Sequence, residues 1–227
     1  MRPMKHGYTN RTLGDGALVR KTYDGPDAAL RLRREHTVLT GLRDRLPVPP
    51  VRAVSADDLT LGHVAGVPGQ ELLDGGHAAA VLTACGEVLR RIHGAGRDVL
   101  PEEDGPGDPP AGAVLVHGDF GPNNLLLDPG TFAVTAVVDW EFAHRGAAVE
   151  DLAWCEWIVR THHPGHRGAL DGFFRAYGGE VPPWPVRRAA MLAKCAEMRR
   201  FCERWEAGGP GVRQWADRAA VTAGWAE

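Results

Sequence analysis

The chain has 227 residues, of which 44% are hydrophobic and 24% charged, and its formal net charge is −3. This size and composition allow one large domain or two small lobes with a hydrophobic core. The net charge does not indicate binding to nucleic acid or to a membrane surface. No apolar run approaches the roughly 20 residues needed to span a bilayer. The N-terminus lacks the apolar core of a signal peptide and the four cysteines form no C-x-x-C pair, so we expect a cytoplasmic protein with reduced thiols.

The first part of the chain predicts a small sheet with one helix. A strand is expected over residues 17–23, after a glycine-punctuated turn, and a helical pattern runs over 26–46. An extended strand, a turn at 56–58 and another strand over 59–64 follow, until glycine and proline break the pattern. This order indicates a compact N-terminal lobe built on a small antiparallel sheet.

Residues 77–93 form the next helix of the prediction. Its apolar residues recur at steps of three and four: Leu82, Cys85, Leu89 and Ile92. This stripe places Cys85 in the core. At the end of the helix we expect His93 to satisfy the last-turn carbonyls. Residues 94–112 then read as a loop, whose acidic residues either flank a cationic substrate or are simply solvated.

The most informative stretch is 115–141, LVHGDFGPNNLLLDPGTFAVTAVVDWE. It predicts a short strand, a polar loop with His117 and Asp119, and a hairpin that turns at Asp-Pro-Gly. Because the two ends of a hairpin lie at one edge, Asn124 before its first strand and Asp139 after its second should meet beside Asp119. Two carboxylates and an amide oxygen suit Mg²⁺, whose remaining ligands are water and phosphate oxygens.

These residues carry a family resemblance. HGDFGPNN followed by VVDWE resembles the H-x-D-x-x-x-x-N and D-W-E segments of the aminoglycoside phosphotransferase and choline kinase-like family, relatives of the protein kinases. The resemblance implies that Asp119 is the catalytic base, that Asn124 and Asp139 hold Mg²⁺, and that His117 braces the loop. We also place Glu141, the last residue of the D-W-E step, among the candidate substrate contacts.

The resemblance further implies an ATP site in the first lobe. Gly7-Tyr8-Thr9-Asn10 resembles the small-residue loop over the phosphates, with Gly7, Thr9 and Asn10 as candidates, although an ordinary turn is the other interpretation. On the strand that follows, Arg20 and Lys21 point to opposite faces, and we favour Lys21 as the phosphate-binding cation.

Two more parts of the ATP site come from the same resemblance. Glu35 takes the place of the helix Glu that pairs with the phosphate-binding lysine; a surface Glu beside a neighbouring Arg is the alternative. Gly62, His63 and Val64 would offer hinge backbone groups to the adenine. The predicted lobes are accordingly residues 1–66, with a hinge near 62–66, and residues 67–227.

The rest of the chain predicts a helical lobe. Asp151 is expected at a helix N-terminus in a structural role, followed by a helix that is apolar nearly all round. Helices over 185–205 and 212–225 close the lobe. On the first of these, Glu197 and Glu203 either contact substrate amines or pair with neighbouring arginines. The histidines of THHPGHR read as a polar loop rather than a metal site.

The sequence therefore predicts a short member of the family with an α+β, two-lobed, protein-kinase-like fold. The expected function is ATP- and Mg²⁺-dependent transfer of the γ-phosphate to a hydroxyl of a small molecule, an aminoglycoside or other antibiotic, or a metabolite or biosynthetic intermediate. One alternative is a nucleotide-binding pseudokinase or regulator without turnover. Another is a hydrolase built on His117 and Asp119, which would need a nucleophile that the loop does not offer.

Overall fold

The N-terminal part of the chain is a five-stranded antiparallel sheet in the order β1-β2-β3-β5-β4. The computed structural model describes residues 1–3, 10–95, 98–100 and 112–227. The strands of this sheet are β1 (Arg2–Pro3), β2 (Arg11–Gly14), β3 (Leu18–Thr22), β4 (Val51–Val54) and β5 (Asp58–Gly62). In β3, Lys21 pairs with Leu59 of β5, and its side chain is buried. Successive side chains of a strand alternate between faces, so Arg20 points to the other face.

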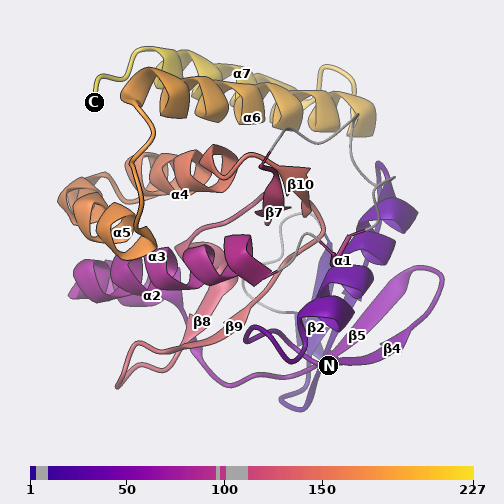
Figure 1. Cartoon of the computed structure of the whole chain (residues 1–227). Helices are drawn as coiled ribbons and strands as arrows, with labels where there is room; N and C mark the ends of the chain where they lie inside the picture. Colours follow the sequence, from indigo (N-terminus) through magenta and orange to yellow (C-terminus); the bar gives the residue numbers. More distant parts are fainter. Residues whose placement is uncertain (4–9, 96–97, 101–111) are drawn as a thin grey trace.

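Helix α1 (Ala28–Leu42) packs beside this sheet and completes what we call the N-terminal lobe (Figure 1). Its buried residues follow helical spacing, and two of the six are charged: Arg31, Leu32, Glu35, Val38, Leu39 and Leu42. Charged side chains on the buried stripe of a helix require partners. Their presence marks the inner face of α1 as part of a polar centre rather than of a purely apolar core.

Two small sheets lie where the lobes meet. One has the order β6-β8-β9, with β6 (Val67–Pro68), β8 (Leu125–Leu127) and β9 (Val134–Val137); the other pairs β7 (Val114–Val116) with β10 (His144–Gly146). Strands β8 and β9 form the predicted hairpin, and the Asp128 carboxylate fixes its turn by accepting hydrogen bonds from the amides of Gly130 and Thr131. The hairpin ends carry Asn124 and Asp139, as the sequence predicted.

The remaining chain is helical and forms the C-terminal lobe. Its helices are α2 (Gly69–Leu72), η1 (Leu73–His77), α3 (Ala78–Ala95), η3 (Pro122–Asn124), α4 (Val149–His162), η4 (Pro164–Ala169), α5 (Leu170–Tyr177), α6 (Trp184–Trp205) and α7 (Pro210–Ala223). Helix α3 packs against α5, and α6 lies between α4 and α7 (Figure 1). Among the described residues, no helix combines the length and apolarity that crossing a membrane requires.

Candidate active site

The loop after β7 carries His117 and Asp119 and is held by a tight backbone turn. Gly118 has φ +82°, and a Cβ there would lie 2.4 Å from the carbonyl oxygen of Phe142. Only glycine meets both conditions, because L side chains disfavour positive φ and the obstacle is backbone. The turn therefore presses this loop against the segment that leads into β10.

His117 braces the loop in the manner that the resemblance implied. Its ring is fully buried; Nδ1 accepts a hydrogen bond from the amide of Asp119 (3.2 Å), and Nε2 lies 3.0 Å from the carbonyl oxygen of Val138. The pair of contacts requires the neutral tautomer with hydrogen on Nε2. Burial lowers the pKa of His117, which keeps this neutral form at physiological pH.

The Asp119 carboxylate is held from two sides but stays partly accessible. One oxygen accepts a hydrogen bond from Trp154 Nε1 (2.8 Å), and the other accepts one from Asn124 Nδ2 (2.9 Å). Burial, with the nearby charge of Asp139, raises the pKa of Asp119 to about 6. A carboxylate with a raised pKa and a fixed orientation suits a general base.

Asn124 and Asp139 are the candidate oxygen ligands for a divalent cation. Asn124 Nδ2 donates to the backbone carbonyl and to the carboxylate of Asp119 (2.7 and 2.9 Å), which leaves Asn124 Oδ1 for another partner. The side chain of Asp139 is 31% exposed. Among the described residues no three His, Cys, Asp or Glu side chains group as metal ligands. This donor set fits Mg²⁺, which takes few protein ligands and completes its shell with water and phosphate.

Lys21 connects the N-terminal lobe to this centre. Its Nζ lies 2.6 Å from Glu35 and 2.5 Å from Asp139, and the Tyr23 hydroxyl donates to Glu35 (2.5 Å). Burial opposes the charge of Lys21, but Asp139 and Glu35 outweigh it and hold the pKa of Lys21 well above its ordinary value. The structure therefore brings Lys21, Glu35 and Asp139 together, and the alternative of a surface Glu35 is wrong because Glu35 is 1% exposed.

Two predicted contacts are placed differently. Asn10 is buried and its amide donates to Glu141 Oε2 (2.7 Å), so its side chain faces the interior rather than a phosphate. Glu141 is fully buried and lies 2.6 Å from Arg31 Nη1, which does not fit the predicted substrate contact. Gly7 and Thr9 lie outside the described residues, as do the acidic residues of the loop at 101–111.

The hinge residues are only partly open to a nucleotide. The amide of Gly62 donates to the carbonyl of Pro50 (2.8 Å), and that of His63 donates to the carbonyl of Ala17 (2.9 Å). These two amides are therefore used within the protein. Adenine contact at this segment stays a prediction for Val64 and for the carbonyl groups.

A family model described as the phosphotransferase enzyme family matches residues 1–112 and 103–190 of the chain. The chain belongs to this family. The match confirms the resemblance inferred from the H-x-D-x-x-x-x-N and D-W-E segments. A comparison with curated proteins finds no significant match.

Solved phosphotransferases share the fold. The macrolide 2'-phosphotransferase MphH from Brachybacterium faecium is 20% identical, with a TM-score of 0.63 over 100% of this chain and 92% of that chain. The gentamicin-APH(2")-IIa complex is 13% identical, with a TM-score of 0.70 over 96% and 90%. APH(3'')-Id from Streptomyces rimosus, in complex with ADP and streptomycin, is 18% identical, with a TM-score of 0.62 over 84% and 90%. These similarities confirm the two-lobed, kinase-like α+β fold.

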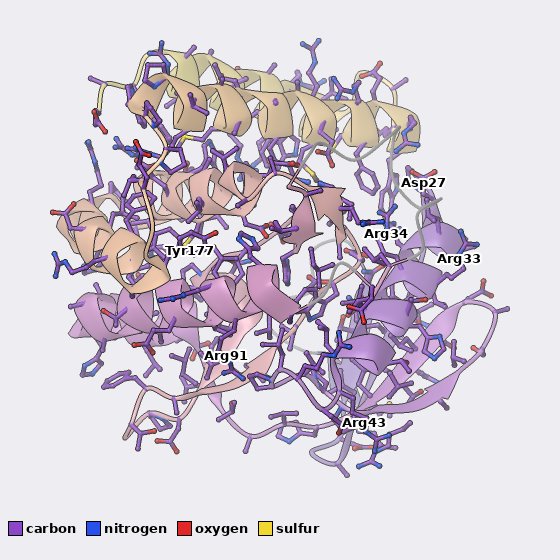
Figure 2. The ribbon with its side chains drawn as sticks, viewed as in Figure 1. Asp27, Arg33, Arg34, Arg43, Arg91 and Tyr177 are labelled. Atoms are coloured by element: carbon purple, nitrogen blue, oxygen red, sulfur yellow. The ribbon has the colours of Figure 1, made fainter. Side chains whose placement is uncertain are left out.

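Asp151 of this phosphotransferase has a different structural role from the one predicted. It lies in the first turn of α4, but its carboxylate accepts hydrogen bonds from the amides of His117 (2.7 Å) and Gly118 (2.9 Å) rather than capping its own helix. His93 Nε2 lies 3.1 Å from the same carboxylate and Nδ1 lies 2.9 Å from the Tyr177 hydroxyl, so His93 does not cap α3 either. Figure 2 labels Tyr177, which lies at the end of α5. Together these side chains anchor the loop that carries His117 and Asp119.

Two further side chains that act on Asp119 were not predicted from the sequence. Trp154 follows Asp151 by three residues, and this helical spacing puts both on the face of α4 that meets the loop. The second is Lys194 of α6, whose Nζ lies 5.1 Å from the Phe142 ring centroid and 2.9 Å from Glu197. Its charge lowers the pKa of Asp119 against the effect of burial. A side chain so distant in sequence leaves no local pattern by which to find it.

The two predicted carboxylates of α6 are exposed but differ in position. Glu197 pairs with Lys194 on the same helix (2.9 Å), whereas Glu203 accepts a hydrogen bond from the amide of Gly208 (3.3 Å) at the turn after α6. Substrate contact by either stays a prediction. In the histidine-rich segment, His163 Nδ1 lies 2.7 Å from Asp74, an ordinary polar contact.

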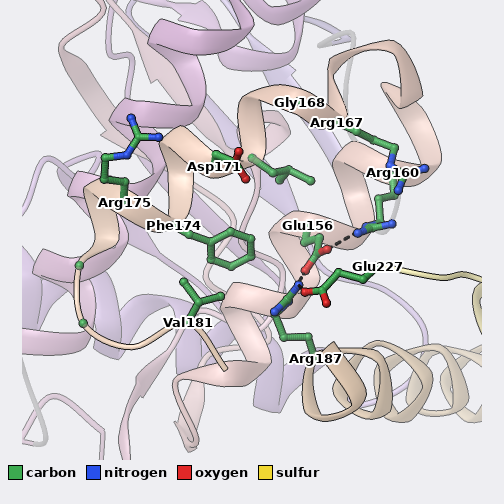
Figure 3. A pocket seen from close by; sticks show the side chains of 13 residues that line it. Glu156, Arg160, Arg167, Gly168, Asp171, Phe174, Arg175, Val181, Arg187 and Glu227 are labelled. Atoms are coloured by element: carbon green, nitrogen blue, oxygen red, sulfur yellow. Dashed lines mark hydrogen bonds and ion pairs between the residues drawn. The ribbon is translucent and has the colours of Figure 1, made fainter. Parts of the chain in front are cut away.

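A cavity of about 1000 Å³ lies on the opposite side of α4, between α5, α6 and η4 (Figure 3). Glu156 reaches it two residues after Trp154, which is more than half a helical turn away from the face that contacts Asp119. Its carboxylate is fully engaged by Arg160 (2.8 Å) and Arg187 (2.7 Å). The cavity is therefore separate from the catalytic centre, and its buried carboxylate is neutralised.

Proposed function

We propose that the protein transfers the γ-phosphoryl group of ATP, with Mg²⁺, to a hydroxyl group of a small molecule. The observation that carries this proposal is the arrangement of Asp119 between Asn124 and Trp154, beside the Lys21–Asp139 pair. It offers a base, a place for a cation and a lysine for phosphate within one partly accessible site. Phosphoryl transfer needs little more than positioning and electrostatic stabilisation.

Each side chain then has a defined task. Asp119 orients the acceptor hydroxyl and accepts its proton, while Lys21, held in place by Glu35, binds the nucleotide phosphates. Asn124 and Asp139 would hold Mg²⁺, which when bound offsets the negative charge of the phosphate oxygens. His117 and Asp151 fix the loop so that Asp119 needs no rearrangement.

The acceptor is proposed to be an aminoglycoside or another antibiotic, with a metabolite or biosynthetic intermediate as the alternative. Three solved phosphotransferases with this fold are a macrolide 2'-phosphotransferase, a complex with gentamicin and a complex with streptomycin, which supports the antibiotic class. Because the charge of Lys194 acts on Asp119, we expect an amine of the acceptor to lie away from Lys194, with the exposed carboxylate of Glu197 as its candidate partner.

The test is consumption of Mg·ATP by the purified protein with a panel of aminoglycosides, macrolides, peptidic antibiotics and hydroxylated metabolites. Turnover that depends on one class of acceptor would support the proposal and identify that class. Binding of Mg·ATP without turnover on any acceptor would favour the nucleotide-binding regulator. Failure to bind nucleotide at all would contradict the proposal.

The pH dependence of turnover is a further expected result. Asp119 acts as a base only when ionised, so kcat/KM should fall as pH drops below about 6, by about tenfold per pH unit. Lys194→Met removes a charge that lowers the pKa of Asp119, so the acid limb of the profile should move to higher pH. Lys194→Arg keeps the charge and should leave the limb in place. An acid limb that stays unchanged in Lys194→Met would contradict the assignment.

A further inference from the structure

Arg31 is a buried cation at a place where three segments of the chain meet. It is 2% exposed on the inner face of α1. Its Nη1 donates to Glu141 Oε2 (2.6 Å) and to Asn10 Oδ1 (3.1 Å), and its Nε donates to the carbonyl of Pro26 (3.0 Å). Nη2 donates to the carbonyl of Asp24. One guanidinium thus holds the start of α1, the residue before β2 and the segment after β9.

Its partner Glu141 lies two residues after Asp139, the candidate metal ligand. Glu141 is fully buried and also accepts a hydrogen bond from Asn10 Nδ2 (2.7 Å). Between the two carboxylates, Trp140 turns into the core, where its ring lies 4.5 Å from that of His117. Within the D-W-E step, Asp139 pairs with Lys21 and Glu141 pairs with Arg31. Both ion pairs join the C-terminal lobe to the N-terminal lobe.

Helix α6 of the C-terminal lobe covers the same junction. The Phe201 ring lies 5.4 Å from the Arg31 guanidinium, on which Tyr23 of the N-terminal lobe also packs at 5.9 Å. At the end of α6, Arg204 pairs with Asp27 (2.7 Å), which Figure 2 labels near the start of α1. Arg31 is thus enclosed by both lobes.

Stability alone is a poor explanation for such a pair. Removing two charges from water costs free energy that their attraction need not recover, and apolar residues of similar volume often replace a buried ion pair without loss. What a hydrogen-bonded ion pair adds is a fixed geometry, since Arg presents its donors in a rigid fork. Here that geometry fixes the position of the segment before β2, which contains Asn10, relative to the segment that carries Asp139 and Glu141.

We propose that Arg31 and Glu141 are positioning residues. They fix the position of Asp139 and Lys21 relative to the segment before β2, and so hold the parts of the nucleotide site that the two lobes contribute in one arrangement. The inference rests on the proposed function, because it concerns the ATP site of that reaction. Neither residue touches substrate, since both are buried. Their effect reaches the reaction through Asn10 and through Asp139, which lies two residues before Glu141.

The experiment replaces both charges at once. Arg31→Met/Glu141→Leu leaves neither partner as an unpaired buried charge, so the variant should fold, with a lower melting temperature because Asn10 and the carbonyls of Asp24 and Pro26 lose hydrogen-bond partners. We expect its KM for Mg·ATP to rise by about tenfold or more, with a smaller change in kcat, because the nucleotide site is misplaced while Asp119 is untouched. Calorimetric binding of Mg·ATP in the absence of acceptor should weaken by the same factor.

A matched control is the exposed pair Arg45–Asp98 (2.8 Å). Arg45→Met/Asp98→Leu should change neither melting temperature nor KM. A folded Arg31→Met/Glu141→Leu protein with wild-type KM and Mg·ATP affinity would overturn the inference while the proposed function stood. Absence of Mg·ATP binding in the wild type would instead overturn the proposed function.

Arg31→Lys tests the inference if the double variant does not fold. This change keeps a cation to pair with Glu141 but removes the rigid fork that also donates to Asn10 and to the carbonyls of Asp24 and Pro26. A raised KM for Mg·ATP in the folded Arg31→Lys protein, with no change in the Arg45→Met/Asp98→Leu control, would support the inference. An unchanged KM would contradict it.

Discussion

Asp119→Asn is expected to lower kcat by about 10²–10⁴-fold, the range that a positioned general base contributes. The amide keeps the shape of the carboxylate and can still accept the hydrogen bond from Trp154, so the loop should stay in place. It cannot take the proton of the acceptor hydroxyl. Affinity for Mg·ATP should be retained, because Lys21 and Asp139 are unaltered.

The measurement is steady-state kinetics with the acceptor identified by the panel, together with calorimetric binding of Mg·ATP. Asp128→Asn is a matched control, since Asp128 lies in the exposed hairpin turn and contacts only that turn. Turnover of Asp119→Asn at a rate near that of the wild type would remove Asp119 from the role of base. An equal loss in Asp128→Asn would show that the effect is not specific to the site.

Asp151→Ala should be the most destabilising single change at this site. It leaves the amides of His117 and Gly118 and the ring of His93 without their buried acceptor, and loss of one partner from a buried charged network costs about 3–5 kcal/mol. Urea unfolding of the variant and the wild type measures this difference. Asp171→Ala, in the first turn of α5 but exposed, should change the free energy of unfolding by less than about 0.5 kcal/mol.

The same carboxylate predicts a pH dependence of stability. Burial opposes its ionisation, but hydrogen bonds from His93 and the His117 amide keep the pKa of Asp151 below its ordinary value. A lowered folded-state pKa stabilises the fold above the pKa of the unfolded chain, and this contribution is lost as pH falls through the lowered value. The wild type should therefore lose stability in acid more steeply than Asp151→Ala. Equal acid sensitivity of the two proteins would contradict this role for Asp151.

The parts of the site that the sequence predicted depend on local geometry. Asn124 and Asp139 meet because a hairpin returns to its starting edge, and a short turn at Asp128 can be recognised from sequence. Strand alternation predicts that Arg20 and Lys21 face opposite sides of the sheet, and Lys21 is the one that lies beside Asp139. Glu35 was implied by the family resemblance, and it lies on the buried stripe of α1.

The parts that the sequence did not predict depend on contacts between distant segments. Asp151 was expected to cap its own helix because it lies at the helix N-terminus. Nothing near it in the sequence indicates that its carboxylate accepts hydrogen bonds from two amides of the distant loop. Glu141, the last residue of the D-W-E step, was expected to contact substrate, yet it is buried and paired with Arg31 of a distant helix. The charge of Lys194 acts on Asp119 because α6 packs against α4. Such contacts follow from the packing of whole lobes.

The central claim is that the γ-phosphoryl group of ATP passes to an acceptor hydroxyl beside Asp119. The most direct measurement follows γ-labelled ATP incubated with Mg²⁺, protein and the acceptor panel, and locates the label in the products. We predict that the label appears as a phosphate ester on one class of acceptor, and that it forms about 10²–10⁴-fold more slowly when Asp119→Asn replaces the wild type. Label found only as free inorganic phosphate, or on the same acceptor at equal rate with Asp119→Asn, would contradict this account.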